Sequence, residues 1–208
     1  MIFSRRFLIS ALLLVLGPTA YGASVSENAV LGRAGNWHKS DQGSPNLQIC
    51  SKKAQAEPQN AEAQNDYGWA LRQNGDLTNA EVYLRKAEAL NPALAYVHSN
   101  LSVVLLDQNK PDESLAEAKK AVTTDGQQPI YHEVLGNALL AAGETKSAIE
   151  EYNAAIKLRP DYENAYYNLG RAYQKDGQIT EAKTALSEAL KFDPNDERSI
   201  MLFDELMK

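Results

Sequence analysis

The chain has 208 residues, of which 44% are hydrophobic and 23% charged, and its formal net charge is −6 at pH 7. An acidic chain without blocks of Lys and Arg is a poor candidate for binding nucleic acid, which proteins hold by neutralising phosphates. The same sign of charge disfavours binding to an anionic membrane surface. The single cysteine, Cys50, excludes a disulfide within the chain.

Residues 1–22 have the pattern of a secretory signal peptide, with Arg5 and Arg6, an apolar run over residues 7–16, and small residues around Gly22. We expect cleavage after Gly22, and a periplasmic or secreted mature chain with 19 Lys and Arg against 27 Asp and Glu, a net charge of −8. The apolar run is shorter than the roughly 20 residues that cross a bilayer, and an uncleaved leader that anchors the chain in the membrane is the alternative. Residues 4–9 also resemble a twin-arginine leader, which leaves the export route open between Sec and twin-arginine.

Residues 23–45 are rich in Gly, Ser and Asn without a sustained period, which predicts a flexible tail that carries Trp37. Residues 46–60 are expected to form a short capping helix or the second half of a degraded repeat, because Pro58 lies one repeat length before Pro92. Cys50 would then be a small buried residue on this helix. The alternative for Cys50 is a reactive or intermolecular thiol.

A recurring pattern divides residues 61–196 into four units of equal length, 61–94, 95–128, 129–162 and 163–196. A fixed period in the range of about 20–50 residues is typical of stacked repeats. Counted from the start of each unit, position 27 is always alanine and position 8 is small: Gly68, Ser102, Gly136 and Gly170. Position 15 holds residues that accept a left-handed turn: Gly75, Asn109, Gly143 and Gly177. Position 32 holds residues that end a helix: Pro92, Gly126, Pro160 and Pro194.

Large residues fill positions 7 and 11, which share one face of the first helix of each unit: Tyr67, Leu101, Leu135, Leu169, Leu71, Leu105, Leu139 and Tyr173. Unit 95–128 departs most from the pattern, so we expect it to pack least tightly. Residues 197–208 predict a helix with Ile200, Phe203, Leu206 and Met207 on one side, which caps the last unit. Its additional apolar residues leave association with another copy of the chain as an alternative.

These positions resemble the tetratricopeptide repeat (TPR) family, whose pattern W-x2-L-G-x2-Y, A-x3-F, A and P falls on them. The resemblance covers residues 61–196 and implies an all-α, right-handed solenoid of stacked helix-turn-helix repeats. At position 4, where the family has an aromatic residue, the chain has Gln64, His98, His132 and Tyr166. Two histidines at the same position of successive units could share a metal ion, but no third Cys or His ligand lies nearby in the repeat. We therefore predict no metal site and no cofactor.

In the family, positions 2, 5, 9 and 12 of each first helix line a concave groove that binds peptides. Some members of the family also have a clamp of polar and basic residues that binds a C-terminal carboxylate. Of its residues, only Asn100 is present in this chain. The groove residues it implies are Asn65, Trp69, Arg72, Tyr96, Ser99, Asn100, Glu133, Asn137, Tyr167, Arg171 and Gln174. Val103, Leu106 and Leu140 fall at the same positions but could equally belong to the core.

The sequence contains no catalytic motif, so we do not expect an enzyme. We predict a non-catalytic periplasmic adaptor or scaffold whose groove binds a peptide or protein segment. Its layout and leader are similar to TPR proteins of envelope machines, including those of pilus assembly and secretion. The alternatives are a self-assembling structural protein, which would be a homo-oligomer, and an accessory subunit that recruits an envelope enzyme. The partner and the pathway do not follow from the fold.

Overall fold

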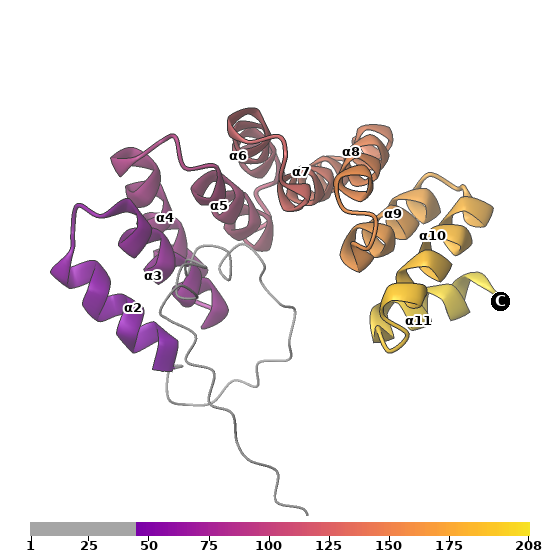
Figure 1. Ribbon diagram of the computed structural model, residues 1–208, viewed down its shortest axis with the longest axis horizontal. Coiled ribbons are helices and arrows are strands. Elements are labelled where there is room, and N and C mark those ends of the chain that lie inside the picture. Colours follow the sequence, from indigo (N-terminus) through magenta and orange to yellow (C-terminus); the bar gives the residue numbers. More distant parts are fainter. Residues whose placement is uncertain (1–44) are drawn as a thin grey trace, which may run out of the picture.

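The computed structural model describes residues 45–208, which form ten α-helices (Figure 1). They are α2 (Pro45–Ala56), α3 (Ala61–Gln73), α4 (Leu77–Leu90), α5 (Ala95–Asp107), α6 (Pro111–Thr124), α7 (Pro129–Ala141), α8 (Thr145–Leu158), α9 (Glu163–Lys175), α10 (Ile179–Phe192) and α11 (Glu197–Leu206). The predicted leader and almost all of the predicted tail, with Trp37, lie outside the described residues. Within the described range, no helix is both long and apolar enough to span a bilayer.

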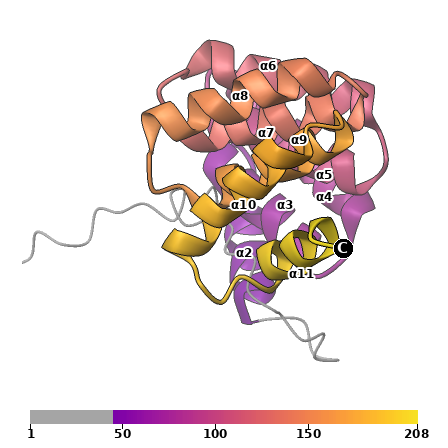
Figure 2. The ribbon, with the colours of Figure 1, turned by 90° about the vertical axis from the view of Figure 1, so that its right-hand side faces the viewer.

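Eight of these helices form four pairs, in which the first helices α3, α5, α7 and α9 pack against the second helices α4, α6, α8 and α10. Each pair packs on the next, and the row bends into an arch with α2 at one end and α11 at the other (Figure 1). Successive first helices contact one another along the inner side of the arch. Figure 2 shows α6 and α8 in the outer layer, above α7 and α9. The predicted all-α stack of helix pairs is confirmed.

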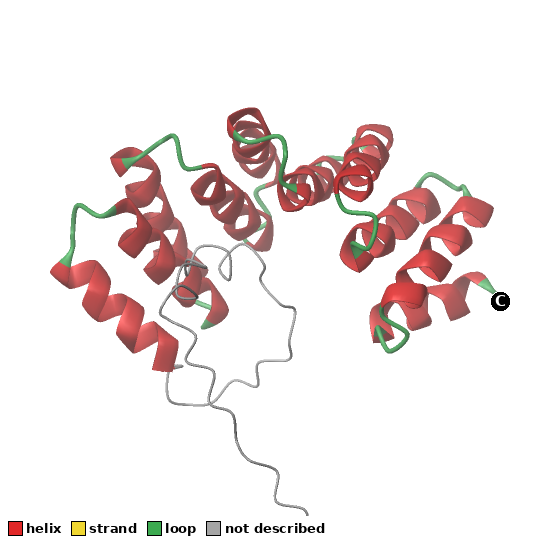
Figure 3. Cartoon of the chain, viewed as in Figure 1, coloured by secondary structure: helices red, strands yellow, loops and turns green. Residues whose placement is uncertain are grey.

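A tight turn at position 15 joins the two helices of each pair, and Figure 3 shows these short loops between the helices. Gly75, Gly143 and Gly177 have φ angles of 85°, 87° and 80°, and Asn109 has a φ of 59°. Glycine adopts this left-handed conformation without strain, and asparagine tolerates it better than most residues. In each turn, the N–H of position 16 donates to the carbonyl of position 11 at 2.9–3.0 Å. The left-handed turn predicted at position 15 is confirmed.

The two helices of a pair approach so closely that position 8 has little room for a side chain. A Cβ atom at Gly136 would lie only 2.5 Å from the ring of Tyr152 on the facing helix. At Gly68 and Gly170, a Cβ atom would lie 2.8 Å from a leucine side chain. The alanines of position 27 are also buried, in every unit. Small residues at these positions therefore set the spacing within the pairs.

In the second pair, α5 with α6, polar residues fill the helix–helix contact at position 8. Ser102 and Ser114 are fully buried, and their Oγ atoms lie 2.8 Å apart. The Ser114 hydroxyl also lies within hydrogen-bonding distance of the Ser102 carbonyl, at 2.9 Å. The facing residue, Ala118, is small enough to leave room for a serine at position 8 and is itself fully buried. The contact at position 8 is therefore filled in this pair as well, and the expectation that unit 95–128 packs least tightly of the four stays a prediction.

The end helices cover the outer faces of the first and last pairs. Cys50 and Ala54 of α2 are buried, and Gln64 Nε2 of α3 donates to the carbonyl of Ala54 at 2.9 Å. Burial raises the pKa of the Cys50 thiol, which disfavours the reactive thiolate. At the other end, the Asp196 carboxylate caps α11 by accepting hydrogen bonds from the backbone N–H and the hydroxyl of Ser199, at 3.3 and 2.6 Å.

We expect Gly136→Ala to destabilise the protein, because the added methyl group would overlap the ring of Tyr152. Overpacking of this kind costs about 1–3 kcal/mol, and urea unfolding followed by circular dichroism measures the loss. The double variant Gly136→Ala/Tyr152→Ala should cost less than the sum of the two single changes. Strictly additive losses would show that the tyrosine ring is not what fills the space at position 136.

Candidate protein-binding groove

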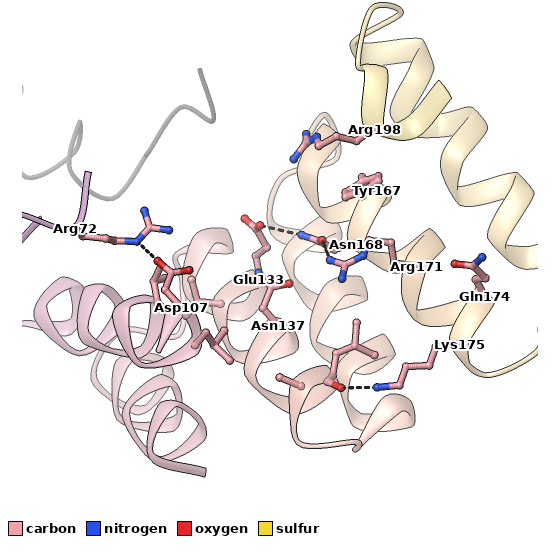
Figure 4. A pocket seen from close by; sticks show the side chains of 15 residues that line it. Arg72, Asp107, Glu133, Asn137, Tyr167, Asn168, Arg171, Gln174, Lys175 and Arg198 are labelled. Atoms are coloured by element: carbon pink, nitrogen blue, oxygen red, sulfur yellow. Dashed lines mark hydrogen bonds and ion pairs between the residues drawn. The ribbon is translucent and has the colours of Figure 1, made fainter. Parts of the chain in front are cut away.

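A cavity of about 1020 Å³ opens on the inner side of the arch (Figure 4). All four first helices and α11 contribute side chains to it. All of its apolar lining residues come from α5 and α7, which also contribute Asp107, Glu133 and Asn137, whereas α9 and α11 contribute only polar, charged and tyrosine side chains. The lining residues are Arg72, Val103, Leu106, Asp107, Glu133, Val134, Asn137, Leu140, Ala141, Tyr167, Asn168, Arg171, Gln174, Lys175 and Arg198. A concave space between packed helices is a common place for a binding site.

The structure brings part of the predicted groove together around this cavity: Arg72, Glu133, Asn137, Tyr167, Arg171 and Gln174. Val103, Leu106 and Leu140, which the sequence left between groove and core, line the same cavity. Sequence reasoning missed Asp107, Asn168, Lys175 and Arg198. The sequence could have predicted Arg198 as a groove residue. It lies one repeat length after Asn164 and so continues position 2 of the repeat into α11.

Three of the predicted groove residues, Asn65, Ser99 and Asn100, do not line the cavity and are buried between α3 and α5. Asn100 Nδ2 donates to Asn65 Oδ1 at 2.9 Å, so these two amides link neighbouring first helices. A buried amide that is satisfied in this way contributes to packing between repeats. A role of these three residues in binding stays a prediction.

Trp69 and Tyr96, at the α3 end of the arch, also lie outside the cavity lining. Trp69 is only 8% exposed, and the guanidinium carbon of Arg72 lies 4.7 Å from its ring centroid. Neither the Trp69 indole N–H nor the Tyr96 hydroxyl has a hydrogen-bond partner among residues 45–208. Arg72 itself pairs with Asp107 at 2.6 Å, which leaves little free charge at this end of the groove.

Positive charge gathers where α9 meets α11. Arg171 and Arg198 lie on either side of Tyr167, with their guanidinium carbons 5.7 and 4.7 Å from its ring centroid (Figure 4). The Asp196 carboxylate, whose Oδ1 lies 2.8 Å from Arg198 Nε, offsets the charge of Arg198. The hydrogen bonds from Arg171 and Lys175 go to uncharged oxygens, at 3.2 and 2.8 Å. Within the described part of the chain, neither Arg171 nor Lys175 forms a salt bridge, and both side chains line the cavity.

The carboxylate of Glu133 is engaged by the fold on both of its oxygens. It accepts a hydrogen bond from the Tyr162 hydroxyl and another from Asn168 Nδ2, the latter at 3.0 Å. Burial raises the pKa of Glu133, and the hydrogen bond from Tyr162 only partly opposes this shift. Glu133 therefore forms hydrogen bonds with neutral donors but, like Arg171 and Lys175, no salt bridge within residues 45–208. Among the lining groups without an oppositely charged partner, two cations thus stand against one carboxylate.

Away from the cavity, His98 of α5 links the first pair to the second. Its Nδ1 lies 2.8 Å from Glu117 Oε2 and its Nε2 lies 2.9 Å from the Pro92 carbonyl oxygen. Both oxygens accept hydrogen bonds, so both ring nitrogens must donate, which requires the imidazolium form. His132 has neighbours at the equivalent places: its Nδ1 lies 2.7 Å from Glu151 Oε2 and its Nε2 lies 3.1 Å from the Gly126 carbonyl oxygen. Each histidine therefore pairs with its own glutamate, and the two do not share a site.

Within residues 45–208, Glu88, His98 and Glu117 form a group whose ligand atoms all lie within 4.8 Å of one another. The spacing alone would suit a metal ion. However, Lys120 Nζ lies 2.9 Å from the Glu88 carboxylate and 2.8 Å from that of Glu117. This ammonium group already supplies a cation between the two carboxylates, so the geometry favours a salt-bridge network.

Family models match the chain in three places. A model described as TPR repeat matches residues 136–177, and two described as tetratricopeptide repeat match residues 163–196 and 41–95. Together these matches cover more than half of the chain.

Two curated relatives illustrate the sequence similarity. Tetratricopeptide repeat protein 6 of Homo sapiens is 26% identical over 150 residues, which is 69% of this chain and 28% of the relative. Cytochrome c-type biogenesis protein CycH of Bradyrhizobium diazoefficiens is 29% identical over 125 residues, which is 59% of this chain and 34% of the relative. The chain thus spans about a third or less of the length of these relatives.

Solved structures share the fold at low sequence identity. TTC0263, a thermophilic TPR protein in Thermus thermophilus, matches with a TM-score of 0.68 and 20% identity, over 77% of this chain and 88% of that one. PilF of Pseudomonas aeruginosa gives 0.66 and 23%, over 73% and 69%. YrrB, described as a TPR protein with an unusual peptide-binding site, gives 0.62 and 19%, over 74% and 80%.

We expect the stability of the protein to fall as pH rises above the ordinary histidine range. The hydrogen bond to Glu117 raises the pKa of His98 above 6.5, so its stabilisation is present below 6.5 and is lost as pH rises through the raised value. Burial opposes the ionisation of Glu117, but bonds from His98 and Lys120 bring its pKa below 4.5. The stabilisation from Glu117 is therefore lost only on the acidic side, as pH falls through its lowered pKa.

The urea midpoint measured against pH tests this in wild type and His98→Gln, which keeps a donor as Gln64 does at the same position. The variant should lose the alkaline decline of the midpoint. Asp112→Asn removes an exposed carboxylate from the same helix as Glu117 and should leave the profile unchanged. An unchanged profile in His98→Gln would mean that His98 is not the titrating group.

Proposed function

The chain belongs to the tetratricopeptide repeat family, and from that premise we propose that it is a non-catalytic scaffold whose groove binds a segment of another protein. The observation that carries the proposal is the cavity of about 1020 Å³ on the inner side of the arch, to which every first helix contributes. The resemblance in fold to YrrB, described as having a peptide-binding site, supports the same use of this surface.

The lining of the groove indicates the chemistry of the bound segment. Arg171 and Lys175 offer positive charge without a carboxylate partner among the described residues, which favours an acidic side chain in the ligand. Tyr167 offers an aromatic face beside them, and Gln174 an amide that can bond to a peptide backbone. Leu106 and its apolar neighbours on α5 and α7 would contact apolar side chains of the same segment. The groove therefore suits a short segment that carries both acidic and apolar side chains.

We further propose that the protein acts in the periplasm after removal of residues 1–22. The signal-like pattern of these residues supports export. Similarity to CycH, a cytochrome c-type biogenesis protein, and to the fold of PilF supports a role in an envelope assembly machine, such as pilus assembly or secretion. Recruitment of an envelope enzyme as an accessory subunit uses the same groove and is the second candidate.

Photocrosslinking in cells tests the groove directly. A photoreactive residue in place of Tyr167 in the full chain should capture a partner protein, whereas the same probe at Val82, which is exposed on α4, should not. Replacing Arg171 by Ala in the probe-bearing chain should lower the adduct yield by about tenfold, the effect of one central arginine anchor. Lys119→Ala removes a positive charge from α6, outside the cavity lining, and should leave the yield unchanged.

Three results would count against the groove proposal. Equal capture from positions 167 and 82 would show contact without a specific site. An adduct that does not respond to Arg171→Ala would place the contact outside the charged end of the cavity. Capture that yields only a second copy of the chain would replace the scaffold by a self-assembling protein.

A further inference from the structure

Each end of the arch carries half of a helix pair, within residues 45–208. α2 packs against α3 as α4 packs against α5, in the manner of a second helix, but no first helix in that range lies beside it. α11 packs against α10 and α9 in the manner of a first helix, and no second helix within residues 45–208 packs against its other side. Figure 1 shows the two helices at opposite ends of the arch. Each end therefore has the element that the other end lacks.

The open face of α11 is apolar at the positions that a second helix normally covers. In the complete pairs, position 11 of the first helix packs against the second helix, and Leu71, Leu105 and Leu139 are buried there. Counted from the start of α11, the same position is Met207, the C-cap residue directly after the helix, which is 61% exposed. Ile200, at position 4, is 38% exposed, and Met201 beside it is 72% exposed. Exposed apolar residues gathered on α11 and at its C-cap mark a contact surface.

The open face of α2 presents a matching apolar residue. Position 23 of a second helix faces position 4 of its first helix, as Glu117 faces His98 at 2.8 Å. In α2, position 23 is Ile49, which is 66% exposed. If α11 of one copy lay beside α2 of the next copy in the register of a complete pair, Ile200 would therefore meet Ile49.

Polar groups in the same register are also compatible. Position 8 of α11 is Asp204 and position 20 of α2 is Asn46. In the second pair these two positions are the buried serines Ser102 and Ser114, whose Oγ atoms are 2.8 Å apart. An Asp204 carboxylate would find the Asn46 side-chain amide as a donor at the equivalent place.

The two end helices carry opposite charge. α2 contains Lys52 and Lys53 and no acidic residue, whereas α11 contains Glu197, Asp204 and Glu205 against one arginine. Lys53 already pairs with Asp66 of α3 at 3.4 Å, so Lys52 is the cation that α2 offers to another copy. In a chain with a net charge of −6, a purely basic helix at one end stands out from the rest. Opposite charges favour the approach of α11 to α2 and disfavour the pairing of α11 with α11.

We propose that copies of this chain associate head to tail, with α11 of one copy and α2 of the next forming one further helix pair. The contact joins two different surfaces, so it leaves a free α2 at one end of the assembly and a free α11 at the other. Added copies therefore extend the solenoid instead of closing a symmetric dimer. Asp204 and Asn46 are longer than the glycine and alanine of most pairs, so this pair is wider and weaker than those within the chain.

Two variants of the full chain, each blocked at one end, test the proposal by sedimentation equilibrium. Ile49→Asp places a carboxylate on α2, and Ile200→Asp places one on α11. The wild-type mass should rise with concentration, and each variant alone should remain monomeric. An equimolar mixture of the two variants should form a dimer and nothing larger, because it contains one intact α11 face and one intact α2 face.

Val82→Asp is the matched control, since Val82 is 58% exposed on α4 and lies on neither end face. It should associate like the wild type, and circular dichroism should show that all three variants are folded. A monomeric wild type at every concentration would overturn the proposal and leave residues 23–44 or another protein as the occupant of the α2 face. Association that survives Ile49→Asp but not Ile200→Asp would overturn it in favour of a symmetric α11 contact. Neither isoleucine lines the groove, so these outcomes are separate from a test of groove binding.

Discussion

The close contact between the two helices of each pair is the constraint on which the rest of the structure depends. Because position 8 is small, a side chain of the second helix packs directly against the backbone of the first. The same spacing in every pair keeps all first helices on one side, which produces the groove. Tyr152 connects the contact within its helix pair to the groove. Its ring covers Gly136, and its hydroxyl donates to Oδ1 of Asn137, which lines the groove, at 2.8 Å. A change in the core at this position therefore reaches the binding surface.

Polar links between neighbouring first helices form a second level of organisation. Each joins two residues that stand one position out of register in successive repeats: Asn100 to Asn65, Asn168 to Glu133, Arg72 to Asp107, and Lys175 to the carbonyl of Leu140. The residues of three of these links line the cavity, where a ligand would meet them, whereas Asn65 and Asn100 are buried. A ligand that takes over one of these bonds also changes the coupling between repeats.

The sequence predicted those features that depend on one position in the repeat. The left-handed turn at Asn109 and the buried alanines follow from local backbone conformation and from the period of the pattern. It could not predict which groove positions stay open, because burial depends on side chains from the next repeat. Asn65 and Tyr167 both occupy position 5, yet Asn65 is buried by its bond to Asn100 while Tyr167 lines the cavity. Arg198 was not predicted, because the apolar residues of α11 indicated a capping helix and the groove positions of the repeat were counted only up to residue 196.

The charge of the groove is opposite to that of the chain, and this separates selectivity from the rate of capture. At distances beyond the Debye length of about 8 Å, an acidic ligand meets a screened and net acidic protein, which does not steer it inward. Arg171 and Lys175 act only at contact distance, where the apolar side chains that α5 and α7 contribute to the lining strengthen their attraction. If the groove binds an acidic segment as proposed, it would discriminate among ligands only after they have bound. Affinity differences between ligands would then arise in dissociation rates, as they do for most interfaces.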